Sequence, residues 1–213
     1  MGFYCRGALA SVLLTVTHCA VSAAPDYIEA ESGELASAYG EKVAERAFSD
    51  ELADTRTEMV KASLIPEQGC GNEPQFVLRD VYLYQVDPSD VMWIERYRVD
   101  CEKEQHRAIL MLLNKDGKFQ AVPMAPGTTI TDPQLQIDAG NIVRTAALTR
   151  GDGSCSESRV VDTDVAEKPE AAGKPWKENW SVLACGTIHD LEVAFTPSET
   201  GGTNITVVAN PNE

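Results

Sequence analysis

Basic residues are scarce in this 213-residue chain, which has 18 Lys and Arg against 33 Asp and Glu and a formal net charge of −15. A surface with this excess of negative charge repels phosphate groups, so nucleic acid and anionic lipid are poor partners. A basic protein or peptide would be steered toward it, whereas the simpler interpretation is that the charge only keeps the protein soluble. Composition therefore excludes partners more firmly than it selects one.

Long apolar runs are also missing, apart from a short one near the N-terminus. A single charge, Arg6, precedes the apolar stretch 8–16, and the small residues Ser22, Ala23 and Ala24 follow it. This order is typical of a secretory signal peptide, and we expect cleavage after Ala23. A lipid-modified Cys19 is the alternative. Since the run is too short to span a bilayer, we predict an exported protein, periplasmic or extracellular, without membrane insertion.

Motifs for catalysis and ligand binding are absent. The chain has no Gly-x-Ser-x-Gly elbow, His-Glu-x-x-His, phosphate loop or calcium loop. It has no Cys-x-x-Cys pair, which argues against a thiol oxidoreductase or a zinc knuckle. Glu102 and Glu104 lie close to His106, and His189 occupies the matching place later in the chain. We interpret both histidines as parts of polar bends, with a metal site as the alternative, and we predict no catalytic, cofactor-binding or metal-binding residue.

One short pattern, by contrast, occurs twice. An aromatic residue, a glutamate, a second aromatic residue, a valine and a cysteine follow one another, with one extra residue before the second cysteine: Trp93, Glu95, Tyr97, Val99 and Cys101, then Trp176, Glu178, Trp180, Val182 and Cys185. In each copy another cysteine lies about 30 positions upstream, and similar apolar runs surround the motif. The sequence therefore predicts a tandem duplication.

The segments around the two motifs predict the same elements. A helix is expected from near Ser49 to before Pro66, and another from Asp132 as N-cap to Gly151. The apolar face of the second helix is expected at Leu135, Ala139, Ile142, Val143 and Ala146. Strand-like runs follow each helix, at 76–86, 93–101, 108–113 and 119–124, then at 159–165, 176–185, 191–195 and 203–208. Because the motif strands alternate, we expect one packed and one wet face in each sheet.

The expected fold is therefore α+β, with two tandem units of one helix and a four-stranded antiparallel sheet (αββββ). We place the signal peptide at 1–23, an acidic segment at 24–48, the first unit at 49–126 and the second at 127–213. The acidic segment is either a packed extra helix or a loose arm. Four cysteines remain after the leader, and pairing within each unit, Cys70 with Cys101 and Cys155 with Cys185, closes the mouth of each first hairpin.

The motif residues carry the only hint of chemistry. On a packed face a lone carboxylate is costly, so we interpret Glu95 and Glu178 as structural residues at a sheet edge, hydrogen-bonded to an arginine or to backbone N–H groups. A paired acid site would need the two carboxylates close together, although they lie in separate copies. The aromatic residues are interpreted as core, with a ligand groove as the alternative: Trp93, Tyr97, Trp176 and Trp180.

Tandem units of a helix and four strands, each with its own disulfide, resemble in outline the architecture of the β-lactamase inhibitory protein. The resemblance covers no residue motif, so it implies no partner and no site. We expect a non-catalytic module of the cell envelope that binds a protein or peptide. The alternatives are a hydrolase that uses carboxylates such as Glu95 or Glu178, and a purely structural envelope module.

Overall fold

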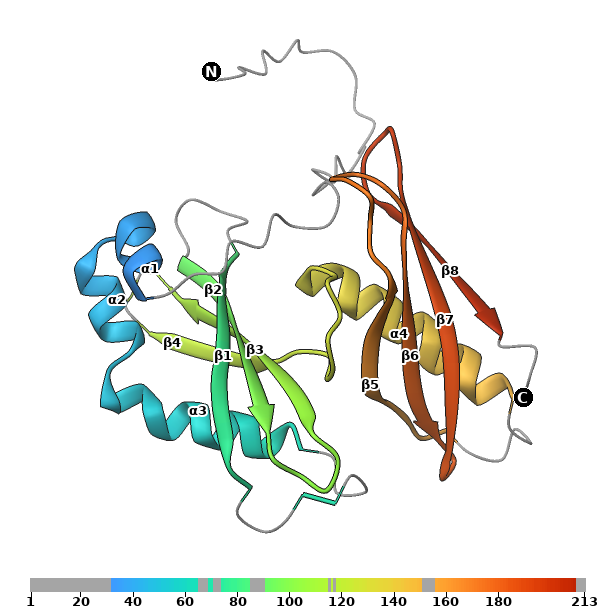
Figure 1. The fold of residues 1–213 in the computed structure, drawn as a ribbon, viewed down its shortest axis with the longest axis horizontal. Coiled ribbons are helices and arrows are strands. Elements are labelled where there is room, and N and C mark those ends of the chain that lie inside the picture. Colours follow the sequence, from blue (N-terminus) through green and yellow to red (C-terminus); the bar gives the residue numbers. More distant parts are fainter. Residues whose placement is uncertain are drawn as a thin grey trace, which may run out of the picture.

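The computed structural model describes residues 32–64, 69–70, 74–84, 91–114, 116, 118–150 and 156–209. The expected signal peptide and the first residues of the acidic segment lie outside these ranges. In the described part the protein is α+β, with two antiparallel sheets of four strands each (Figure 1). The strands of each sheet lie in chain order, β1-β2-β3-β4 in sheet A and β5-β6-β7-β8 in sheet B.

The elements follow one another in the order that the sequence predicts. Sheet A consists of β1 (Phe76–Leu83), β2 (Val91–Val99), β3 (Gln105–Leu113) and β4 (Phe119–Pro123), and α3 (Asp50–Ala62) precedes it. Helix α4 (Pro133–Thr149) then precedes sheet B, which consists of β5 (Ser158–Glu167), β6 (Trp176–Ala184), β7 (Thr187–Pro197) and β8 (Thr203–Ala209). Figure 1 shows α3 lying across sheet A and α4 across sheet B.

Two further helices, α1 (Ser32–Tyr39) and α2 (Glu41–Ala47), form in the acidic segment. Leu35, Ala44 and Ala47 are buried in the same core as Trp93 and Tyr97. Of the two alternatives for this segment, the described residues therefore adopt the packed helical one. Burial of these apolar side chains favours the packed arrangement, while the acidic side chains of Glu41 and Glu45 stay exposed.

Helix α4 starts where its capping residues predict. The carboxylate of Asp132 accepts a hydrogen bond from the backbone N–H of Leu135 at 2.8 Å, and Pro133 occupies the first turn. Its buried stripe is centred on Ala139, Val143 and Ala147. The expectation that Ile142 is part of this stripe was wrong, because its side chain is 41% exposed. Ile142 lies one position, or about 100° around the helix, from Val143, at the outer limit of the buried face.

The strands that carry the motif alternate as expected. In β2 the residues from Trp93 to Val99 at odd positions are all buried, and β6 shows the same period from Trp176 to Val182. In sheet A the Trp93 ring packs edge-on against Phe119, with centroids 5.8 Å apart. In sheet B the Trp176 ring stacks on Phe195 at 4.8 Å. These contacts place the motif aromatics in the two hydrophobic cores.

The opposite face of sheet A differs from the expectation of a wet face. Ile94 and Ala108 project to this outer face, yet both are buried. The segment that connects β4 to α4 covers them: the backbone N–H of Met124 bonds to Ala108 O, and Arg96 donates to Thr129 O at 2.6 Å. The reason is visible in β3, where apolar residues run without alternation from Ala108 to Leu113, as in strands buried on both faces.

The same connection fixes sheet B relative to sheet A. The backbone N–H of Gly127 bonds to His106 O in β3, while the next N–H, that of Thr128, bonds to Thr163 O in β5 at 2.7 Å. Thr163 in turn donates its hydroxyl to Pro126 O. Gly127 has a φ of +96°, in the left-handed region, and a Cβ there would lie 2.1 Å from Thr163 O. Only glycine therefore permits this close contact between the connection and β5.

The first predicted disulfide is confirmed, since Cys70 and Cys101 are bonded with their Cα atoms 4.3 Å apart. It ties the chain just before β1 to the chain just after β2. Cys155, the predicted partner of Cys185, lies outside the described residues, so the second pairing stays a prediction. No helix in the described ranges is long and apolar enough to cross a membrane.

Candidate functional site: an inter-sheet groove and two buried glutamates

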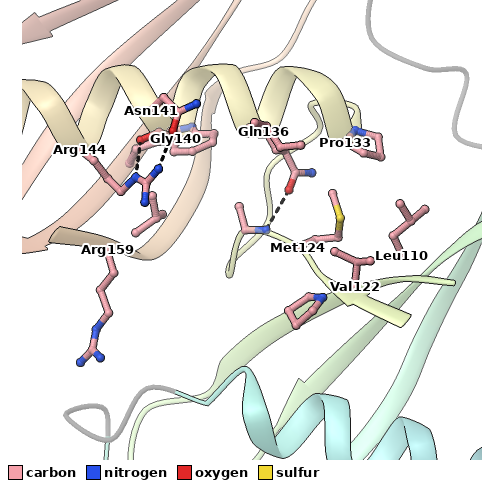
Figure 2. Close-up of a pocket in the computed structure, with 14 residues that line it drawn as sticks. Leu110, Val122, Met124, Pro133, Gln136, Gly140, Asn141, Arg144 and Arg159 are labelled. Carbon is pink, nitrogen blue, oxygen red and sulfur yellow. Dashed lines mark hydrogen bonds between the residues drawn. The ribbon is translucent and has the colours of Figure 1, made fainter. Parts of the chain in front are cut away.

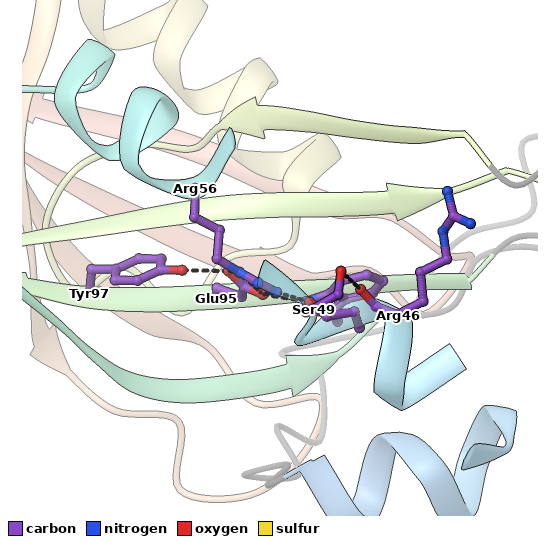
Figure 3. Close-up of polar contacts among 7 residues, drawn as sticks. Arg46, Ser49, Arg56, Glu95 and Tyr97 are labelled. Atoms are coloured by element: carbon purple, nitrogen blue, oxygen red, sulfur yellow. Dashed lines mark hydrogen bonds and ion pairs between the residues drawn. The ribbon is translucent and has the colours of Figure 1, made fainter. Parts of the chain in front are cut away.

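Glu95 is a fully buried carboxylate at the centre of sheet A. The side chains two positions before and after it both donate to it: Trp93 Nε1 at 2.8 Å and Tyr97 OH at 2.5 Å. Arg56 reaches over from α3 and donates through Nη2 at 2.7 Å and through Nε at 2.9 Å (Figure 3). The carboxylate thus joins the sheet to its covering helix.

The neighbours of Glu95 respond to its charge. Burial and the negative charge of Glu95 raise the pKa of Tyr97 far above its ordinary value, so its hydroxyl remains a donor at physiological pH. Arg56 also donates to Ala47 O, at the end of α2, and its guanidinium lies 5.4 Å from the centre of the Phe48 ring. One arginine therefore connects α2, α3 and β2.

Glu178 occupies the equivalent place in sheet B and is also fully buried. It accepts hydrogen bonds from Trp176 Nε1 at 3.1 Å and from Trp180 Nε1 at 2.9 Å. Its third donor is the backbone N–H of Ile130 at 3.0 Å, in the connection that leads into α4. Here the carboxylate ties the sheet to the connection rather than to a basic side chain.

The position of these glutamates corrects one expectation. We expected them at a sheet edge, but β2 and β6 each have a strand on both sides. A carboxylate can occupy this interior place because its aromatic neighbours in the sequence supply its donors, which offsets the cost of burial. The two glutamates lie in different sheets, and each is enclosed by its own donors. This arrangement offers no pair of accessible carboxylates for acid–base chemistry.

The two histidines lie apart. His106 in β3 has its Nε2 3.4 Å from Glu104 Oε1, and His189 pairs with Val182 in sheet B. Among the residues that the structure describes, no three His, Cys, Asp or Glu side chains are grouped so as to hold a metal ion.

A groove lies between the two sheets, with a cavity volume of about 390 Å³. Its walls are the middle of β3, the end of β4, the connection, one side of α4, the start of β5 and Trp180 of β6, and we call it the inter-sheet groove (Figure 2). The lining includes the apolar side chains of Leu110, Val122, Met124 and Ile137 and the charged side chains of Arg144 and Arg159. Gln136 holds one wall in place, since its side chain accepts from Ala125 N and donates to Thr131 O, both at 2.9 Å.

The lining is mostly apolar, and several apolar side chains in it are open to solvent. Ile137 is 58% exposed and Val122 is 49% exposed. Among the described residues that form the lining, Arg144 and Arg159 are the only charged ones, and none is Asp or Glu. In Figure 2 these arginines lie toward one end of the groove, whereas Leu110, Val122, Met124 and Pro133 lie toward the other.

Sequence reasoning did not predict this groove. A ligand groove was the alternative interpretation for four aromatic residues, and one of them, Trp180, does line the inter-sheet groove. Its ring also packs in the core of sheet B. Two signals were present: the unbroken apolar run in β3, and Ile137 outside the expected apolar face of its helix. Neither shows which surfaces meet, because that depends on how the connection orients the sheets.

Comparisons with known proteins add no relationship. No protein family, curated protein or solved structure matches this chain. The likeness to the β-lactamase inhibitory protein therefore remains one of expected outline, and the groove is the feature on which a functional hypothesis can be built.

Proposed function

We propose that this chain is an exported, non-catalytic protein that binds a peptide segment of a partner in the inter-sheet groove. The observation that carries this proposal is an apolar groove, open to solvent, between two sheets that are hydrogen-bonded to one connection. Contiguous exposed apolar surface marks interaction sites more often than isolated apolar residues do. Export is supported by the leader-like residues 1–23 and by the disulfide, which persists in oxidising compartments.

An extended chain fits the groove better than a small molecule does. Small ligands are usually enclosed over most of their surface, whereas Val122 and Ile137 leave this groove open. The groove is also bordered by β4 and β5, which are outer strands of their sheets, and extended peptides commonly bind along such strands. Because Gly127, Thr163 and Gln136 hold the walls in place, little ordering is needed on binding.

The proposal is tested by screening the full-length protein, expressed with its own leader, against random-sequence peptides tethered by their N-termini. Affinity for a selected peptide is then measured by fluorescence anisotropy for the wild type and for Ile137→Asp. We expect Ile137→Asp to weaken binding roughly tenfold or more, since it places an unpaired charge in the apolar groove. The melting temperature should barely change, because the side chain is already exposed.

Ile188→Asp is the matched control. Ile188 is 56% exposed, close to the value for Ile137, but it lies in β7 and outside the groove lining. Its substitution should leave affinity unchanged. The proposal would be wrong if no peptide bound, or if the two substitutions weakened binding equally.

The alternatives have less support. A hydrolase based on Glu95 or Glu178 would have to open a core around a fully buried carboxylate. A purely structural envelope module gives no reason for an open apolar groove. The duplication and the Cys155–Cys185 pairing are part of the same proposal, since two units of one ancestry would account for the matching strand order and the matching glutamates.

A further inference from the structure

Two outer strands, β4 and β5, border the inter-sheet groove. In an antiparallel pair, residues whose N–H and C=O groups bond to the neighbouring strand alternate with residues whose groups point away from it. On an outer strand, the groups that point away are available to a further strand. This alternation therefore determines whether β4 or β5 can pair with a bound peptide.

At the start of β5 the alternation is set by the bond from the N–H of Cys185 to Glu157 O. Glu157 thus bonds toward β6, and in the register of the two strands the next residue of β5 to do so is Arg159. Ser158 and Val160 point their N–H and C=O groups away from β6. In the described part of the chain, no backbone hydrogen bond reaches these groups from the other side.

The same edge of β5 is paired once, further along the strand. A register shift between Val160 and Asp162 makes Thr163 point away from β6 as well. There the connection bonds to the edge, with Thr128 N–H donating to Thr163 O at 2.7 Å. The connection therefore covers the edge at Thr163, and the groups of Ser158 and Val160 lie before the place where it ends.

The space beside this part of β5 is open. Val160 and Arg159 line the inter-sheet groove, while Ser158 and Arg159 line a second cavity of about 480 Å³. Because both cavities include Arg159, they lie next to each other at the start of β5. Figure 2 shows Arg159 on one side of the groove and Val122 of β4 on the other. A strand added to β5 here would have the apolar lining of the groove within reach of its side chains.

The end of β4 does not offer an equivalent edge. Met124 N–H bonds to Ala108 O, so Met124 bonds toward β3 and Pro123, the residue before it, points away. Pro123 lines the groove, and proline has no N–H to donate. Proline on an outer strand is one of the ways in which proteins prevent pairing with another chain. The contrast between the two edges assigns strand pairing to β5.

We infer that a partner peptide binds in the inter-sheet groove as an added strand of sheet B, bonded to the backbone of Ser158 and Val160. This inference rests on the proposed function and specifies how the peptide is held. Main-chain hydrogen bonds supply affinity for an extended segment. Since side chains of a strand alternate between its two faces, the apolar lining at Val122 and Ile137 selects apolar side chains at every second position of the peptide.

The test uses a peptide selected in the screen and resynthesised with a single backbone amide N-methylated, one position at a time. The methyl group removes one donor and leaves the side chain and the charge unchanged. We expect affinity to fall about tenfold or more at alternate positions, where the peptide N–H bonds to β5. The positions between them should tolerate methylation, and they are the matched control because they carry the same added group.

Amide hydrogen exchange, followed by NMR on the isotope-labelled protein, identifies the paired strand. Peptide binding should slow exchange of the Val160 N–H roughly tenfold or more, because this group becomes hydrogen-bonded. Val165 is the control within the same strand. It also points away from β6, two positions after Thr163, but it lies beyond the connection and outside the groove lining. Its exchange should not change.

The inference is wrong if methylation is tolerated at every position, or if the losses of affinity follow no alternation. It is also wrong if exchange at Val160 is unchanged by the bound peptide, or is slowed no more than exchange at Val165. In each of these cases peptide binding stands, and side-chain contacts alone hold the peptide. If no peptide binds, the proposed function fails as well.

Discussion

Glu95 in sheet A and Glu178 in sheet B accept hydrogen bonds from the aromatic side chains two residues before and after them. They differ in the third donor. Glu95 is paired with the guanidinium of Arg56 from α3, whereas Glu178 is bonded to the backbone N–H of Ile130. The same local arrangement thus holds a helix to sheet A through a charged pair and holds the connection to sheet B through a neutral donor.

This difference shows how far a short pattern determines its surroundings. The aromatic donors are supplied by the motif itself, because residues two apart on a strand project from the same face. The third donor comes from a distant part of the chain and depends on the fold. Within the described ranges, a buried cation balances the carboxylate in sheet A but not the one in sheet B, so the two glutamates should respond differently to substitution.

The substitution Glu95→Gln should lower the free energy of unfolding more than any other change considered. Loss of this carboxylate leaves the largely buried Arg56 without its counter-charge, which costs roughly 3–5 kcal/mol. Glu178→Gln removes an acceptor from neutral donors and should cost about 1–3 kcal/mol. Urea unfolding followed by tryptophan fluorescence measures both, since Trp93 reports on sheet A and the other two tryptophans report on sheet B.

A double-mutant cycle with Arg56→Met is the control for this comparison. The double variant of Glu95→Gln with Arg56→Met should be less destabilised than the sum of the single losses, because no buried charge is left unpaired. Equal losses for Glu95→Gln and Glu178→Gln, or an additive cycle, would contradict the difference that the structure shows.

The next largest effect concerns the cysteines. Replacing Cys70 and Cys101 by serine should lower the free energy of unfolding by roughly 3–4 kcal/mol, because their bond joins residues 31 positions apart. The same double change at Cys155 and Cys185 should lower it by a similar amount if the second pair forms. Non-reducing peptide mapping identifies the linkage directly. Free thiols at Cys155 and Cys185, with a negligible effect of their replacement, would break the parallel between the two sheets.

The fold of each sheet followed closely from local signals. The alternation in 93–99 and 176–182 determined which residues are buried, and Asp132-Pro133 determined where α4 begins. These are contacts between near neighbours or along single strands. The sequence also predicted that the buried glutamates would bond to an arginine or to a backbone N–H, but it could not show which glutamate has which partner.

The groove was beyond such reasoning for a physical reason. It exists because the connection bonds to β3 on one side and to β5 on the other, and because Gly127 lets the backbone approach Thr163. These contacts join residues that are far apart in the sequence. The residues involved follow no regular spacing from which the contacts could be predicted. The exposed Ile137 and the unbroken apolar run of β3 were the visible traces of this packing, and each alone is compatible with several arrangements of the two sheets.

The smallest expected effect is a difference between the two sheets in how their stability depends on pH. All six tyrosines precede residue 98, so the half that contains sheet B has none, and Trp180 stands where sheet A has Tyr97. Burial and the charge of Glu95 raise the pKa of Tyr97, and burial with the charge of Asp132 raises the pKa of Tyr84 to about 12. An unfolded tyrosine loses its proton near pH 10. Above that pH the unfolded chain therefore binds fewer protons than the native one.

Stability that depends on these tyrosines is thus fully present below about pH 10 and is lost as the pH rises toward the raised pKa. The loss is at most about 1.4 kcal/mol per pH unit for Tyr97 and smaller for the half-exposed Tyr84, whose charge is screened by solvent. Urea titrations between about pH 9 and 11 should show the Trp93 signal of sheet A weakening first. Tyr97→Phe should cost about 1 kcal/mol at neutral pH, through one lost hydrogen bond, but should flatten this alkaline dependence. The interpretation would be wrong if the loss of stability at alkaline pH were unchanged in Tyr97→Phe, or if it were equally steep for sheet B. In either case the change from Tyr97 to Trp180 at the second aromatic residue of the motif would not distinguish the two halves.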